Sequence, residues 1–467
     1  MTRKLVIGLL FICALAVAET PGTVAIVNAR IVRVSGPPIA KGTVVVRNGL
    51  IEAVGENVSV PADAWVVAGE GLTVYPGLID PLSTVGIEGA ATAATTTGGR
   101  GGRGATPATP ATPGAQPTQT AAAERARGPE DRPATTSWLL AADELQTTDR
   151  RIETVRSAGF TTTATFPSRG IFAGQGSLID LIGAERAGDM VVVPSLGQYI
   201  SLSRGGGFGG GGGGGGFPGA LMGVIAYIRQ IYLDAAHYQL AKDVYAKDPR
   251  GMERPAYDRA LEGVLASKRI LFPANRLVEI DRMLRFAAEL KQPVVIYGGR
   301  ETYRPEAAEL LRKAGAPVLV SIRWPEAPRD PNPEDVDSLR VLEQRDKAPS
   351  APALLQKAGV RFALYTDGLD QPRDIQRAVK KAIDAGLSRE DALRALTLSP
   401  AEIYGVADRM GSIEKGKIAN LVVTKGEIFD DRTSIQMIFV DGKKYTPASD
   451  NTGGGRGTAI TEPGEIQ

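Results

Sequence analysis

Apolar runs alternate with helical patterns over most of the middle of the chain. The runs that predict buried strands are Thr161–Phe166, Ile270–Pro273, Val294–Tyr297, Val318–Ile322 and Phe362–Thr366. Helices are predicted at Asp149–Ala158, Ala220–Lys247, Leu277–Leu290, Pro305–Ala314, Ala351–Ala358 and Pro372–Ala385, and we expect Ala220–Lys247 to be amphipathic. Strands that alternate with helices through short turns indicate an α/β protein, with parallel units closed into a barrel or laid out as an open sheet.

Both ends of the chain have the short apolar runs of a β structure. Thr23–Val34, Gly42–Val46 and Leu50–Val54 are rich in Val and Ile, and Asn48-Gly49 between two of these runs predicts a hairpin. Asn420–Thr424 and Ile435–Val440 return to the same pattern. We therefore expect residues 19–75 and 412–446 to form one composite β-sandwich beside a barrel of residues 76–411.

Three segments have a composition that does not predict a packed core. Residues 89–136 are mostly Ala, Thr, Gly and Pro, and we expect a disordered insertion. Residues 204–219 are nearly all glycine and predict a flexible loop, because no phosphate-binding fingerprint accompanies them. Residues 447–467 are expected to be a disordered tail.

The first eighteen residues have the pattern of a signal peptide. Arg3 and Lys4 precede the apolar stretch Leu5–Val17, and Ala16-Val17-Ala18 is a cleavage pattern. A membrane anchor is the alternative, but the apolar stretch is short for a span, so we expect no stable membrane insertion. Cys13 is the single cysteine and leaves with the leader. The chain is therefore expected to be exported, to the periplasm or beyond, with no thiol or disulfide.

Charge and histidine content limit the possible functions. The chain has 54 Lys and Arg residues against 52 Asp and Glu residues, so nothing in its charge favours a nucleic-acid partner. It has a single histidine, His237, which helical geometry places on the solvated side of the helix at 220–247.

Three segments together resemble the amidohydrolase superfamily, especially its imidazolonepropionase-like members. They are VNARIVRVSGPPIAKGTVVVRNGLIEAVG leading to VYPGLID (27–80), VRFALYTDG (360–368), and ALTLSPAEIYGVADRMGSIEKGKIANLVV running on to FVDGK (395–443). The resemblance implies a (β/α)8 TIM-like barrel with a split β-sandwich. It also implies hydrolysis of non-peptide C–N bonds by one or two divalent metals such as zinc, which activate a water molecule. A carboxylate after the last strand serves the family as metal ligand and proton shuttle, and Asp367 matches it.

The sequence departs from that family where the metal is held. Histidines are expected at positions 82 and 84, but the run PGLIDPLSTVG has Leu82 and Thr84 there. The run Pro273-Ala274-Asn275-Arg276 stands where a histidine run is common, so Pro273 and Asn275 are further degenerate ligand positions, and Tyr297 is another. One histidine cannot build the usual site, and we therefore expect no cofactor although the family uses zinc or a similar metal.

Other polar residues offer a different site. Asp367 is the candidate for a vestigial or rebuilt catalytic site, or else forms a turn or caps the next helix. Arg300 and Arg323 follow predicted strands and are candidates for binding a small ligand, or else form loop salt bridges. Arg169, Gln175 and Ser177 have the same two interpretations, and Asp80 is expected to be structural.

Three functions follow as hypotheses, and whether the chain is an enzyme stays open among them. The first is a metal-deficient, pseudoenzyme-like homologue that binds a small ligand or partners an active amidohydrolase relative, in a homo-oligomer or hetero-oligomer. The second is a hydrolase of C–N bonds with a rebuilt site around Asp367. The third is a subunit with a purely structural role in an assembly.

Overall fold

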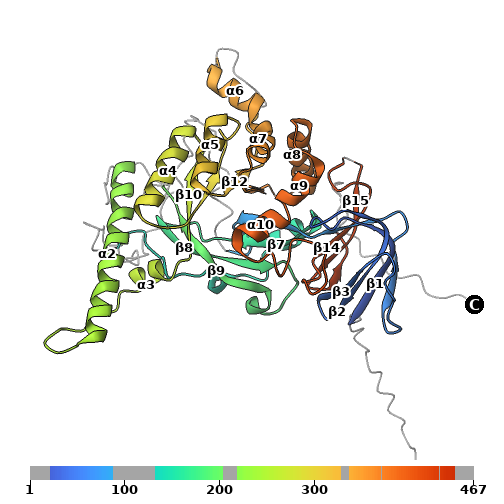
Figure 1. Cartoon of the computed structure of the whole chain (residues 1–467), viewed down its shortest axis with the longest axis horizontal. Coiled ribbons are helices and arrows are strands. Elements are labelled where there is room, and N and C mark those ends of the chain that lie inside the picture. The colour runs from blue at the N-terminus through green and yellow to red at the C-terminus, as the bar shows by residue number, and fades with distance from the viewer. Residues whose placement is uncertain are drawn as a thin grey trace, which may run out of the picture.

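The computed structural model describes residues 22–87, 132–202, 218–327, 336–369, 371–430 and 432–447. Within them, a barrel with helices on its outside lies beside a second sheet (Figure 1). The predicted leader lies outside the described residues, and so do residues 88–131, 203–217 and 448–467. In the part of the chain that is described, no helix has the length and apolar character needed to cross a membrane.

Eight strands form the barrel sheet in chain order. They are β6 (Leu78–Ser83), β7 (Phe160–Thr165), β8 (Phe172–Asp180), β9 (Val191–Ile200), β10 (Ile270–Ala274), β11 (Val294–Gly298), β12 (Val318–Ser321) and β13 (Phe362–Tyr365). The last strand lies beside the first, where the Thr366 hydroxyl donates to Asp80 Oδ2 at 2.6 Å. This closure confirms the predicted α/β class and the TIM-like barrel.

One strand of the barrel runs against the others. β8 is antiparallel to both β7 and β9, whereas the remaining neighbours pair in parallel. Only residues 166–171 join β7 to β8. A parallel connection needs a crossover of about a dozen residues or more, so this short connection requires β8 to run antiparallel to β7. The barrel is therefore TIM-like without repeating the β/α unit at every strand.

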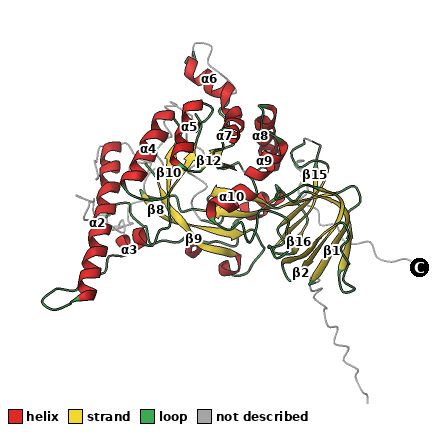
Figure 2. Ribbon diagram, viewed as in Figure 1, coloured by secondary structure: helices red, strands yellow, loops and turns green. Residues whose placement is uncertain are grey.

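Helices surround the barrel between the later strands (Figure 2). They are α1 (Arg151–Ser157), α2 (Leu221–Lys247), α3 (Arg259–Leu265), α4 (Leu277–Glu289), α5 (Pro305–Ala314), α6 (Leu339–Lys347), α7 (Ala351–Lys357), α8 (Pro372–Asp384), α9 (Arg389–Ala395) and α10 (Leu398–Tyr404). The local sequence explains their ends: α5 begins with Pro305 in its first turn and stops at Gly315, whose φ of 63° only glycine adopts readily.

α2 differs from the prediction because it is not amphipathic. One face is buried against the barrel and consists of Val224, Tyr227, Ile228, Ile231, Tyr232 and Ala235. The opposite face is also apolar, with Leu233 and Leu240 about 60% exposed. His237 is exposed on this helix, as the helical geometry predicted.

The second sheet is built from both ends of the chain. Its strands are β1 (Thr23–Ile31), β2 (Ile39–Arg47), β3 (Leu50–Gly55), β4 (Trp65–Ala68), β5 (Thr73–Pro76), β14 (Leu421–Lys425), β15 (Ser434–Val440) and β16 (Lys443–Tyr445). β5 pairs with β14, and the predicted hairpin forms at Asn48-Gly49, where both residues have positive φ. Strands from both chain ends thus form one β domain around its own apolar core, in agreement with the predicted composite β domain, and hydrogen bonds link all of them into one sheet.

The predicted disordered insertion is too long at its C-terminal end. Residues 132–136 are part of the ordered structure: Arg132 forms ion pairs with Asp234 at 2.5 Å and Asp258 at 3.3 Å, and Thr135 bridges to Phe172 on β8. Contacts with residues distant in the sequence hold residues 132–136 in place, and composition alone did not predict those contacts.

Candidate ligand site at the barrel mouth

Polar residues gather where the parallel strands of the barrel end, and we call this opening the mouth. Arg300, Arg323 and Asp367 follow β11, β12 and β13, which are neighbours in the sheet. Ser321 donates to Asp367 Oδ2 at 2.7 Å and accepts from the backbone N–H of Arg323 at 3.2 Å. Arg300 lies 3.6 Å from the same carboxylate oxygen. The structure thus brings together the three charged residues that the sequence predicted separately.

Two buried polar atoms near these strand ends have no hydrogen-bond partner among the described residues. They are Nε of Arg323 and Oδ1 of Asn275. The Asn275 amide fits here because Gly298 has no side chain: a Cβ at Gly298 would lie 2.5 Å from Asn275 Oδ1. A buried polar atom without a partner is costly, so a bound ligand with matching polar groups would be stabilised here.

The first degenerate ligand position, Leu82, is filled by apolar packing. Leu82 is 8% exposed and belongs to the same core cluster as Phe166 and Tyr365. Thr84 is held instead by Arg151, which donates to its hydroxyl at 3.1 Å and to its carbonyl at 2.9 Å. Neither position presents a metal-binding atom to the mouth.

Aromatic residues occupy the barrel interior at the other positions. Tyr297 stacks on Tyr199 with ring centroids 5.1 Å apart, and its hydroxyl donates to the Ile200 carbonyl at 3.0 Å. Burial raises the pKa of Tyr297 well above its usual value, so the hydroxyl stays protonated at neutral pH. Pro273 lies on β10 and has no side-chain donor or acceptor. The sequence did not identify Tyr199 and Tyr365 as neighbours of the site.

Asp80 lies under the mouth and is a structural residue, as expected. It is 1% exposed and accepts hydrogen bonds from the Thr366 hydroxyl and from the backbone N–H groups of Leu82 and Thr366. Burial raises the pKa of Asp80 to about 7, although these hydrogen bonds act in the opposite direction. Its contacts join the first and last strands of the barrel.

Two other sequence candidates have structural contacts. Gln175 donates to the carbonyls of Ser137 and Gly263, and Ser177 donates to the carbonyl of Pro194. Both side chains lie on the antiparallel strand β8, and their hydrogen bonds hold neighbouring segments together. They therefore do not belong with Arg300 and Arg323.

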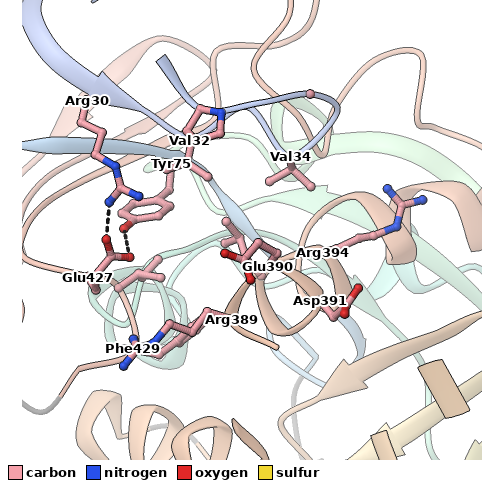
Figure 3. Close-up of a pocket in the computed structure, with 14 residues that line it drawn as sticks. Arg30, Val32, Val34, Tyr75, Arg389, Glu390, Asp391, Arg394, Glu427 and Phe429 are labelled. Carbon is pink, nitrogen blue, oxygen red and sulfur yellow. Dashed lines mark hydrogen bonds and ion pairs between the residues drawn. The ribbon is translucent and has the colours of Figure 1, made fainter. Parts of the chain in front are cut away.

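A cavity of about 310 Å³ lies away from the mouth, between the second sheet and α9 (Figure 3). Glu427 pairs with Arg30 and accepts from the Tyr75 hydroxyl at 2.9 Å. Arg389 pairs with Asp430 at 2.7 Å. The Arg389–Asp430 pair ties α9 to the loop between β14 and β15, whereas the Arg30–Glu427 pair lies within the second sheet's own segments. The cavity shares no lining residue with the mouth.

The fold and the polar strand ends define the class of the protein: a TIM-like barrel with its polar residues at one opening and an accessory sheet made from both chain ends. Residues 302–447 match the model of the Amidohydrolase family. Over 109 residues the chain is 35% identical to the imidazolonepropionase of Flavobacterium johnsoniae. The matched region is 20% of this chain and 26%, about a quarter, of that relative's length.

Solved structures extend the likeness to nearly the whole chain. An amidohydrolase from Thermotoga maritima MSB8 is similar over 90% of this chain and 99% of its own, with 25% identity and a TM-score of 0.70. Phenylurea hydrolase B shares the fold over 91% of this chain and 97% of its own, with 15% identity and a TM-score of 0.53. The family model, the curated relative and the Thermotoga structure all support a likeness to the amidohydrolase superfamily.

The likeness to this family corrects one expectation. Amidohydrolases typically use a divalent metal, so the prediction that no cofactor is expected is wrong for a chain with these relatives. The residues present do not fit the family's metal. Among the described residues, no group of three or more His, Cys, Asp or Glu side chains gathers around one point. The positions where the resemblance predicted ligands hold packed Leu82, tethered Thr84 and hydrogen-bonded Tyr297.

Proposed function

We propose that this chain is a ligand-binding member of the amidohydrolase superfamily that takes a small organic carboxylate at the barrel mouth. The observation that carries the proposal is the buried Nε of Arg323, which has no partner within the described chain. An unmatched buried guanidinium nitrogen is stabilised when an anionic oxygen binds to it.

The charge balance of the mouth supports an anion. Arg300 and Arg323 bring two positive charges to the ends of adjacent strands, and Asp367 neutralises one of them. Asp80 adds little negative charge below pH 7, because burial raises its pKa to about 7. A planar guanidinium matches a carboxylate with two parallel hydrogen bonds, so a carboxylate fits better than a compact halide.

The test is carboxylate binding by calorimetry, with benzoate and succinate as probes and benzamide and succinamide as uncharged controls. We expect Arg323→Gln and Arg300→Gln each to weaken carboxylate binding at least tenfold. Arg285→Gln is the matched control, since Arg285 is 80% exposed on α4 and its ion pair is with Asp281. Equal binding of the amides, or unchanged binding by both mouth variants, would refute the proposal.

Hydrolysis of a C–N bond is the second candidate, and the position of Asp367 favours it. The carboxylate follows the last barrel strand and is oriented by Ser321. A carboxylate at this place suits proton transfer to a leaving nitrogen. Turnover of cyclic ureides or lactams that falls at least a hundredfold in Asp367→Asn would support this candidate, whereas equal turnover by the variant would exclude it.

Export and partnership with an active relative are further proposals. The pattern of residues 1–18 supports export, and processing after Ala18 in a secreting host, detected by mass spectrometry, would test it. The loss of the family's histidines supports partnership with a relative that retains them. Copurification of such a relative from the native source would favour that arrangement.

A further inference from the structure

α2 has an apolar face that no other part of the described chain covers. Met222 is 84% exposed, Leu233 59%, Leu240 60% and Val244 42%. At about 100° per residue these four side chains and exposed Ala226 lie within about 40° of one another around the helix. We call these five residues the outer stripe. A surface helix normally has a polar outer face, so an apolar stripe opposite the buried one indicates a partner.

The outer stripe is long, and its far end lies beyond the barrel. From Met222 to Val244 it extends about 33 Å at a rise of 1.5 Å per residue. Ala235 is the last buried residue of α2, and the rest of the helix projects past the barrel strands (Figure 1). There, Tyr238 and Lys242 contact Glu262 in the first turn of α3, at 2.9 and 2.5 Å. These two polar contacts leave the outer stripe free to meet another molecule.

We infer that the outer stripe pairs with the same stripe of a second copy of this chain, antiparallel, about a two-fold axis at Leu233. The stripe is symmetric about that residue: Met222 and Val244 stand eleven positions before and after it, and Ala226 and Leu240 seven positions before and after. The axis therefore places Leu233 against its copy, small Ala226 against large Leu240, and Met222 against Val244. Small residues opposite large ones interdigitate well.

The polar residues beside the stripe match under the same symmetry. Gln230 and His237 lie on one edge, three positions before and four after Leu233, so the axis brings them together as a hydrogen-bonding pair. Arg229 lies on the other edge and meets Ala236, so no like charges oppose each other. Arg229 keeps its ion pair with Glu289 in the same chain. Matching of a surface with itself is the property of a two-fold interface, which argues for a second copy over an unrelated protein.

The first test is the mass of the purified chain by light scattering after size exclusion. We expect twice the chain mass for the native sequence and one chain mass for Leu233→Glu and Leu240→Glu, with unchanged circular dichroism. Leu342→Glu is the matched control, because Leu342 is 49% exposed on α6, outside the stripe. It should stay dimeric. A native chain that is monomeric at tens of micromolar, or a dimer that survives both stripe variants, would overturn the inference.

The second test fixes the register by cross-linking. Cys13 is the single cysteine, so Cys13→Ser gives a background free of thiols. In it, the double variant Ala226→Cys with Leu240→Cys should form a covalent dimer on mild oxidation. Each single variant should not, because the axis separates identical positions by about 21 Å. Equal cross-linking of a single variant, or none by the double variant, would contradict antiparallel pairing about Leu233.

Discussion

Buried Asp80 makes the stability of the barrel depend on pH in an unusual direction. Its pKa is about 7 in the folded chain, against a value of 3.8 for a free side chain. Between those two pH values the folded state holds a proton that the unfolded state has released. The free energy of unfolding therefore falls as pH rises from about 4 to about 7 and is level above that. The difference of about three pKa units corresponds to roughly 4 kcal/mol.

Asp80→Asn isolates this effect, because the amide stays uncharged at every pH. We expect the stability of the variant relative to the native chain to increase by about 3 kcal/mol between pH 5 and pH 8. The measurement is urea unfolding followed by tryptophan fluorescence at pH 5, 6, 7 and 8. Asp180, whose pKa burial raises to about 6, titrates in both proteins and cancels in the comparison.

A difference between the two proteins that does not change with pH would show that Asp80 is ionised in the folded barrel. In the same assay extended to pH 3, a native chain that loses stability relative to the variant as pH falls from 5 to 3 would show that the hydrogen bonds with Thr366 stabilise the charged form more than burial destabilises it. Either result would refute the reasoning, because both require the folded pKa to lie near or below the ordinary value.

Three other substitutions test the packing around the site. Gly77→Ala should lower the free energy of unfolding in urea by about 1–3 kcal/mol, because its Cβ would lie 2.0 Å from a neighbouring threonine oxygen. Gly188→Ala is the control: a Cβ there would have no atom within 4 Å, so the free energy of unfolding should not change. Arg151→Met should cost about 2–3 kcal/mol in the same assay, because it removes the donors to Thr84; an unchanged midpoint would mean that water replaces them. Glu301→Ala should speed amide exchange in α6, which has no buried residue and is held to the barrel by two ion pairs, Arg340–Glu301 and Glu343–Arg304, of which the variant removes the first. Unchanged exchange would contradict this.

Much of the fold was predictable because its strands and helices repeat a clear pattern. The strands β10 to β13 and the helices α4, α5, α7 and α8 lie within a few residues of their predicted positions. Strands β8 and β9 were not predicted, since Gly174, Gly176 and Gly197 interrupt their apolar runs. Packing requires glycine at position 176, because a Cβ there would lie 2.1 Å from the Phe166 ring.

The site was predictable in its parts and less so in its arrangement. The sequence shows Leu82 and Thr84 where the resemblance predicts histidines, and it places Arg300 and Arg323 after predicted strands. What replaces the histidines is not visible, because the partners are distant: Arg151 is 67 residues from Thr84, and Tyr199 is about a hundred from Tyr297. Only the closed barrel brings such pairs together.

The pairing of β5 with β14 has a consequence for how the chain is made. Tyr75 lies opposite Val422, so the second sheet joins strands from nearly opposite ends of the sequence. During synthesis the amino-terminal strands leave the ribosome first. The edge of β5 that pairs with β14 then stays unpaired until residues 421–445 have been made. Closing so large a loop is entropically costly and slow. Chaperone protection of that edge, or a late folding step after release from the ribosome, is therefore a requirement of this topology.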